Sequence, residues 1–150
     1  MKTNTIELYI HIPFCKSKCR YCDFCSFRAE EETIHAYLGK LKEELIFWGK
    51  KLAARDVVTV FIGGGTPSYL RREDIQMICE TIFEHFHICE DAEITIEANP
   101  GTVDLKKLCT YRENGINRIS FGLQSTVKEE LEYLGRIHTY EQFLQCYNWA

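Results

Sequence analysis

Short apolar runs alternate with longer amphipathic segments along the whole chain, and this alternation restricts the fold more than any other feature. The apolar runs cover residues 8–12, 57–62, 92–97 and 116–124. Helical periodicity covers residues 33–54, 75–86, 104–114, 127–134 and 140–149. Strands that alternate with helices indicate a parallel sheet with right-handed crossovers. We therefore predict an α/β fold with about four strand–helix units. The continuous run at 57–62 predicts a strand buried on both faces.

Length and composition fit one globular domain, because hydrophobic residues make up 45% and charged residues 27% of the 150 residues. The net charge of −4 predicts no nucleic-acid partner. No apolar run approaches the roughly 20 residues of a membrane-spanning helix, so we expect no membrane span. The first fifteen residues lack the apolar core of a signal peptide. We therefore expect a cytoplasmic protein.

Four of the eight cysteines fall within eleven residues, at positions 15, 19, 22 and 25. In a chain without a secretion signal, so tight a group favours metal binding over disulfides. Cys15, Cys19 and Cys22 have a C-x3-C-x2-C spacing, which suits three corners of a 4Fe–4S cluster and leaves the fourth iron open to a ligand. The loop follows a strand end, where ligands bind in parallel α/β folds.

Cys25 keeps other assignments open. With Cys15, Cys19 and Cys22 it could enclose a zinc ion in a non-enzymatic module, or complete the ligation of an electron-transfer cluster. The spacing nevertheless differs from the ferredoxin pattern and from paired zinc knuckles. The scattered cysteines, at positions 79, 89, 109 and 146, are expected to act as small apolar residues.

Further polar residues follow the other strands. Gly63, Gly64 and Gly65 precede Thr66 and would let a ligand approach the backbone closely. Glu97 and Gln124 end the third and fourth strands, at the edge where barrel enzymes place their sites. From its local sequence alone, Arg136 reads as a surface charge. We expect an inward-facing, hydrogen-bonded His11, and solvated side chains at His35, His85, His87 and His138.

The run from Tyr9 through His11, Pro13 and the three cysteines to Phe24 closely resembles the radical S-adenosylmethionine superfamily. Within it, the chain resembles the branch shared by oxygen-independent coproporphyrinogen III oxidases and related heme chaperones. The resemblance covers essentially all 150 residues. It implies a partial TIM-like barrel of six strand–helix units, of which residues 1–150 would form the first two-thirds. The expected domain is thus a radical SAM core that stops before the last units.

The resemblance also implies cofactors and their contacts. Cys15, Cys19 and Cys22 would carry the 4Fe–4S cluster, and the open iron would hold S-adenosylmethionine for cleavage by one electron from a donor protein. The segment Gly64, Gly65 and Thr66 would hold the methionine amino group. The remaining contacts implied for the cofactor are Tyr9, Tyr21, Glu97, Gln124 and Arg136. Without the resemblance, Tyr9 and Tyr21 read equally well as core packing.

Two branches then have to be separated. Oxidases of this branch carry a further cysteine two positions after the third, where this chain has Phe24. The segment from Gly115 to Ser125 also resembles the heme chaperones more closely. We therefore expect a heme-chaperone type, whose full-length relatives bind heme for transfer. Oxidative decarboxylation of coproporphyrinogen III in porphyrin biosynthesis is the alternative, and we expect a short chain of either type to lack complete activity of its own.

Overall fold

The computed structural model describes residues 4–150 and contains the parallel α/β fold that the alternation predicts. Four strands, β1 (Thr5–Ile12), β2 (Asp56–Gly64), β3 (His87–Ala98) and β4 (Arg118–Phe121), form one parallel sheet in the order β1-β2-β3-β4. Crossovers pass through α1 (Glu31–Lys51), α2 (Arg72–His85) and α3 (Leu105–Glu113). The short helices η1 (Pro67–Tyr69) and η2 (Pro100–Thr102) follow β2 and β3, and α4 (Lys128–Leu134) and α5 (Tyr140–Trp149) follow β4.

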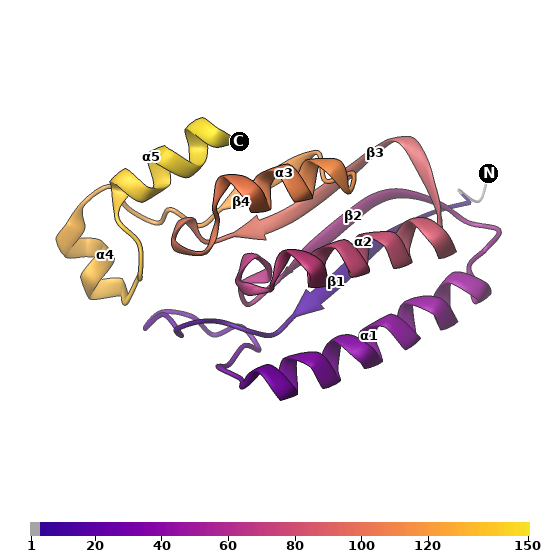
Figure 1. Ribbon diagram of the computed structural model, residues 1–150, viewed down its shortest axis with the longest axis horizontal. Helices are drawn as coiled ribbons and strands as arrows, with labels where there is room; N and C mark the ends of the chain where they lie inside the picture. Colours follow the sequence, from indigo (N-terminus) through magenta and orange to yellow (C-terminus); the bar gives the residue numbers. More distant parts are fainter. Residues whose placement is uncertain (1–3) are drawn as a thin grey trace.

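The three crossover helices cover one face of the sheet, because sequential strand order and crossovers of one hand place them on the same side. Figure 1 shows α1, α2 and α3 as neighbours along the sheet. The apolar core lies between these two layers. Its fully buried members include Ile12, Ile62, Ile75, Ile78 and Ile96.

The opposite face of the sheet is only partly covered, so the prediction that residues 57–62 are buried on both faces is wrong. Val57, Val60 and Ile62 are buried, whereas Val58, Thr59 and Phe61 are half-buried. Tyr9 stacks on Phe61 on this second face and is 59% exposed. A single helical layer can bury only one side of a parallel sheet.

The fourth strand is shorter than its apolar run predicts. Residues 114–115 form a turn, and residues 116–117 connect it to β4; the Asn117 side chain there accepts from Ile94 N and donates to Ala92 O. After Phe121 the chain turns tightly, since Leu123 N donates to Phe121 O and Ser125 N donates to Leu123 O. Both ends of the expected strand therefore lie outside β4.

Three solvent-exposure predictions need correction. His138 is buried, since it packs beside η2 and bonds to Leu123, and the side chain of His85 is only 22% exposed. Cys109 is exposed on α3, unlike Cys79 and Cys146, which are buried as expected. Within residues 4–150, no helix combines the length and apolar character that crossing a membrane requires.

Candidate functional site

The cysteine loop, residues 13–30, connects β1 to α1, and backbone hydrogen bonds join its two ends. Cys15 N donates to Phe27 O (3.0 Å) and Phe27 N donates to Pro13 O (2.9 Å), which pinches the loop shut at its base. Phe14 is fully buried and meets Phe27 and Tyr37 edge to face. The base of the loop is therefore anchored in the core, and Cys15 leaves the sheet from a fixed point.

Within the loop, short-range bonds shape the backbone. Cys22 N donates to Cys19 O (3.1 Å), and Lys18 Nζ donates to the carbonyls of Phe24 (3.2 Å) and Ser26 (3.1 Å). Arg20 N reaches Leu134 O (3.0 Å) at the end of α4. Figure 1 shows the loop and α4 together beyond the ends towards which the strands point. Two segments more than 100 residues apart thus form one end of the molecule.

The glycine segment after β2 lies directly against the first cysteine. Gly65 N donates to Ile12 O and Thr66 N donates to Phe14 O, both at 2.8 Å. Thr66 Oγ1 donates to Cys15 Sγ (3.4 Å). A side-chain carbon at Gly65 would lie 2.8 Å from Phe14 O and 3.0 Å from Cys15 Sγ, so only glycine fits there.

Glu97, at the end of β3, reaches back to the glycine segment. Its Oε2 accepts from Gly64 N (2.9 Å), and Gly64 has φ +116°, a conformation that favours glycine. Burial, and then the Glu97 carboxylate, raise the pKa of Tyr9 above its ordinary value. Tyr9 OH itself bonds to His11 Nδ1 (3.0 Å), and His11 Nε2 bonds to Cys25 O (3.1 Å). His11 is therefore hydrogen-bonded, as expected.

Arg136 closes the site from the far end of the chain. It donates from Nη1 to Cys19 Sγ (3.3 Å) and to Tyr21 OH (3.4 Å), and from Nη2 to Gly122 O (2.5 Å). Burial raises the pKa of Tyr21 despite the nearby guanidinium. The chain reverses at Gln124, which has φ +68°. Arg136 is a half-buried site residue, not the surface charge that its local sequence suggests.

These segments enclose a cavity of about 280 Å³. Its lining includes ten residues singled out from the sequence: Cys15, Cys19, Tyr21, Cys22, Gly64, Gly65, Thr66, Glu97, Gln124 and Arg136. The lining does not include Tyr9, which lies on the half-covered sheet face, or Cys25, whose side chain is exposed. Tyr9 and Cys25 therefore lie outside the cavity that the other ten residues line.

Sequence reasoning missed several residues of the lining, among them Phe24, Asn99, Phe121 and Gly122. A side-chain carbon at Gly122 would lie 3.2 Å from Arg136 Nη2 and 3.3 Å from Gln124 Nε2. The glycine therefore leaves room for both side chains. The only sequence signal for Gly122 is a glycine at a strand end, which is common at turns.

The donor groups around the cavity suit anionic sulfur. A hydroxyl is directed at Cys15 Sγ and a guanidinium at Cys19 Sγ. Arg136 Nε is buried and has no hydrogen-bond partner within residues 4–150, which leaves one donor available to a ligand. In the same range, no three His, Cys, Asp or Glu side chains converge closely enough for a single metal ion.

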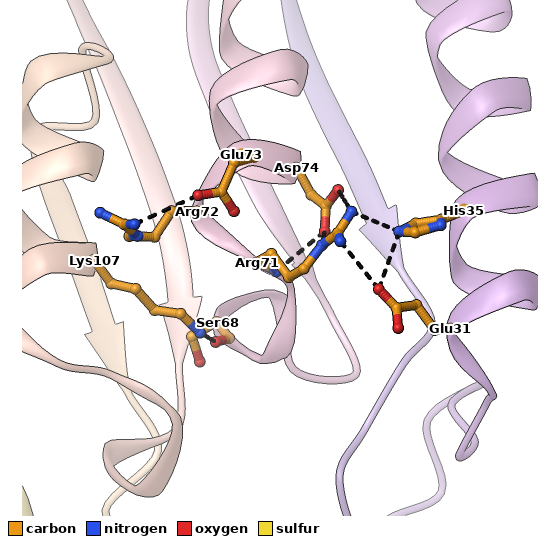
Figure 2. A network of polar contacts seen from close by, with 8 residues as sticks. All are labelled: Glu31, His35, Ser68, Arg71, Arg72, Glu73, Asp74 and Lys107. Carbon is orange, nitrogen blue, oxygen red and sulfur yellow. Dashed lines mark hydrogen bonds and ion pairs between the residues drawn. The ribbon is translucent and has the colours of Figure 1, made fainter.

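A buried polar network braces the wall behind the cavity. Ser68, in the middle of η1, accepts from Asn99 N (2.9 Å) and bonds to Thr102 Oγ1 (2.6 Å). Lys107 Nζ donates to Ser68 O (2.6 Å) and Thr102 O (2.9 Å), and burial lowers the pKa of Lys107. Figure 2 shows Lys107 reaching across to Ser68. The segments after β2 and β3 are thereby fixed to each other.

A second, more exposed network joins the starts of α1 and α2. Arg71 pairs with Glu31 (3.0 Å) and with Asp74 (3.2 Å), and its Nη2 lies 2.6 Å from His35 Nε2. Figure 2 shows these four side chains meeting between the two helices. Because the Arg71 side chain is about half exposed, these ion pairs orient α1 and α2 relative to each other more than they stabilise the fold.

Comparison with known proteins places this geometry in a family. Residues 9–150 match the model of the radical SAM superfamily. The heme chaperone HemW of Escherichia coli is 44% identical over 139 residues, which are 92% of this chain and 37% of that protein. HemW of Bacillus subtilis is 39% identical over 87% of this chain and 35% of that protein. A bovine mitochondrial radical S-adenosyl methionine domain-containing protein 1 is 35% identical over 92% of this chain and 31% of its own length.

The fold agrees with that result. The solved structure of coproporphyrinogen III oxidase HemN from Escherichia coli, described as a radical SAM enzyme, superposes with a TM-score of 0.92 at 32% identity. The match covers 99% of this chain and 34% of that one, so the four strand–helix units correspond to part of a TIM-like barrel. The chain spans 35–40% of the length of the HemW proteins named above and of a third from Haemophilus influenzae. The chain belongs to the radical SAM superfamily.

Proposed function

We propose that the cavity is a cofactor site, with a 4Fe–4S cluster held by Cys15, Cys19 and Cys22 and S-adenosylmethionine bound beside it. The observation that carries the proposal is the meeting of these three cysteines with Gly64, Glu97 and Arg136 around one cavity. When bound, the cluster and S-adenosylmethionine would supply one-electron chemistry that protein side chains lack. An electron donor is then required as a partner.

The roles of the chain's own residues follow from their contacts. Thr66 and Arg136 would stabilise the cysteine sulfurs by donating hydrogen bonds. The glycine segment would offer backbone groups to the amino end of the cofactor, with Glu97 beside it. Gln124 and the unpartnered Nε of Arg136 would complete the polar contacts, and Tyr21 would shield the cavity from water. For Tyr9 we propose an indirect role, through its contact with His11.

For the biological role, we propose a heme-chaperone type of protein, in which heme binding for transfer belongs to the full-length relatives. The greater identity to HemW, at 36–44%, supports this choice over the oxidase, at 32%. Phe24, two positions after Cys22, supports it too. We further propose a cytoplasmic location, because clustered ligand cysteines such as Cys15, Cys19 and Cys22 stay reduced and outside disulfides in a reducing compartment.

The fold match of 0.92 to HemN favours oxidation of coproporphyrinogen III as the second candidate function. The two candidates separate when an anaerobically reconstituted full-length form receives either heme or coproporphyrinogen III. Stoichiometric heme binding without release of carbon dioxide supports the chaperone type. Carbon dioxide release that depends on S-adenosylmethionine supports the oxidase and contradicts our choice.

The cluster assignment itself is tested by a pair of cysteine variants. We expect Cys19→Ala to abolish iron–sulfur assembly, because Cys19 lines the cavity and accepts from Arg136. We expect Cys25→Ala to keep it, because the Cys25 side chain is exposed and outside the lining. Iron and sulfide per chain are the measurements. Equal loss in both variants, or stoichiometric zinc without iron in the unmodified protein, would replace the proposal with a four-cysteine metal site.

A further inference from the structure

The turn that presents Gln124 to the cavity is hydrogen-bonded by two side chains of a later segment, Arg136 and His138. Arg136 Nη2 donates to Gly122 O, and His138 Nε2 lies 3.1 Å from Leu123 O. The carbonyls are consecutive, and the two side chains stand two residues apart in the chain. Together they form a clasp on the backbone immediately before Gln124.

The clasped backbone is strained. Gln124 is the only residue other than glycine with a positive φ within residues 4–150. Ser125 N donates to Leu123 O (2.9 Å), so residues 123–125 form a γ-turn with a positive φ at its centre. Turns of this kind are rare and strained, and they persist only where the surroundings hold them.

His138 is built into the core of this end of the molecule. It is 4% exposed, and a side-chain carbon at Gly101 would lie 3.4 Å from His138 Cβ. Because Leu123 O can only accept, the bond requires the proton on Nε2. The other ring nitrogen, Nδ1, is buried and has no partner within the described range 4–150. Within residues 4–150, the hydrogen bond of the His138 ring is therefore the one to Leu123 O, in the strained turn.

We propose that His138 is a positioning residue that holds Gln124 in its strained conformation and so sets the affinity of the site for S-adenosylmethionine. This inference rests on the proposed function. His138 does not line the cavity, so its effect would pass through the backbone of residues 123–124. Loss of its donor would let the turn relax and move the Gln124 amide away from the cavity.

The test compares three variants of the reconstituted 150-residue chain by iron content and by affinity for S-adenosylmethionine. His138→Leu should keep its iron but bind S-adenosylmethionine about tenfold more weakly, the scale of one lost hydrogen bond to a buried group. His138→Gln carries a donor at the position of Nε2 and should recover most of the affinity. His87→Leu is the matched control, since His87 is 71% exposed at the other end of β3, and should behave as the unmodified chain.

Unchanged affinity in His138→Leu would overturn the proposal, and so would a glutamine variant as weak as leucine. A second measurement holds even where the leucine variant does not fold. Nitrogen NMR of the imidazole in the unmodified, cofactor-free chain should show the proton on Nε2, and a proton on Nδ1 would overturn the clasp. If the unmodified chain takes up neither iron nor S-adenosylmethionine, the proposed function fails. The NMR result then still tests whether His138 Nε2 donates to Leu123 O, because it is measured without cofactors.

Discussion

At the residue scale, the side chains around the cavity are fixed by partners that lie far away in the sequence. Thr66 meets Cys15 across 51 positions, and Arg136 meets Cys19 across 117. Such contacts restrict rotamers without help from neighbouring sequence. Substitutions here are therefore expected to affect the site before they affect the fold.

Alanine substitutions at Gly65, in the site, and at Gly39, on the surface of α1, should have opposite effects on stability. Gly65→Ala should cost about 1–3 kcal/mol of stability by overpacking, because its added carbon would meet Phe14 O and Cys15 Sγ. Iron uptake should fall with it. Gly39→Ala, on the exposed side of α1 with no atom within 4 Å, should stabilise the chain by roughly 0.5–1 kcal/mol. Denaturant unfolding and iron content measure both, and an iron-loaded Gly65→Ala would contradict the tight contact.

His138 also makes stability depend on pH. Burial lowers the pKa of His138, Arg136 lowers it further, and the bond to Leu123 opposes them. The unfolded chain therefore takes up a proton at a higher pH than the folded chain does. His138 makes its full contribution to the free energy of unfolding above the ordinary histidine pKa, near 6.5. That contribution is lost as the pH falls towards the lower pKa that His138 has in the folded chain. Unfolding across this range should show the loss, and His138→Gln should flatten it; an unchanged profile would contradict the shift.

At the scale of elements, the ends of the strands are joined by buried side chains as well as by the sheet. Ser68 has no exposed surface and links η1 to the end of β3 through Asn99 N. Ser68→Ala would leave that amide without its partner, which typically costs about 1–3 kcal/mol. Ser17→Ala, at an exposed loop position, is the control and should cost almost nothing. Equal unfolding free energies for the two variants would show that the Ser68 bonds are dispensable.

Periodicity predicted α1, α2 and α3 because their apolar faces meet one core, and it also predicted the peripheral helix at the end of the chain. The helix over 140–149 is observed as Tyr140–Trp149, with Thr139 accepting from Gln142 N as its cap. The third strand begins five residues earlier than its apolar run, at His87, because His87 pairs with Asp56 and Ile88 with Val57 in a ladder that hydrophobicity does not mark. The shortened β4 and the buried His138 were mispredicted because side-chain bonds to distant backbone determine both.

The candidate site was predictable only as far as its motifs extend. Cysteine spacing and the glycine segment identified one side of the cavity. The other side, from Ser120 to Gly122, carries no local signal, because its contribution is backbone geometry and empty space. Arg136 entered the prediction only by resemblance to the family, since nothing in its own segment distinguishes it from a surface arginine.

At the scale of the whole molecule, one layer of helices supports an open sheet, and the site collects at the ends of its parallel strands. The register pairs Ile12 with Gly64, Ile62 with Ile96 and Ala98 with Phe121, so consecutive strands end together. The cysteine loop and α4 then close over that edge. This arrangement explains how residues from 15 to 136 bound a single cavity.

The most direct test of the account is anaerobic iron–sulfur reconstitution of the chain, with spectra recorded before and after S-adenosylmethionine is added. A cluster held by Cys15, Cys19 and Cys22 leaves one iron open to the added ligand. We predict a 4Fe–4S spectrum that changes on addition of S-adenosylmethionine. A spectrum that stays the same, or a chain that takes up no iron, would contradict the central claim.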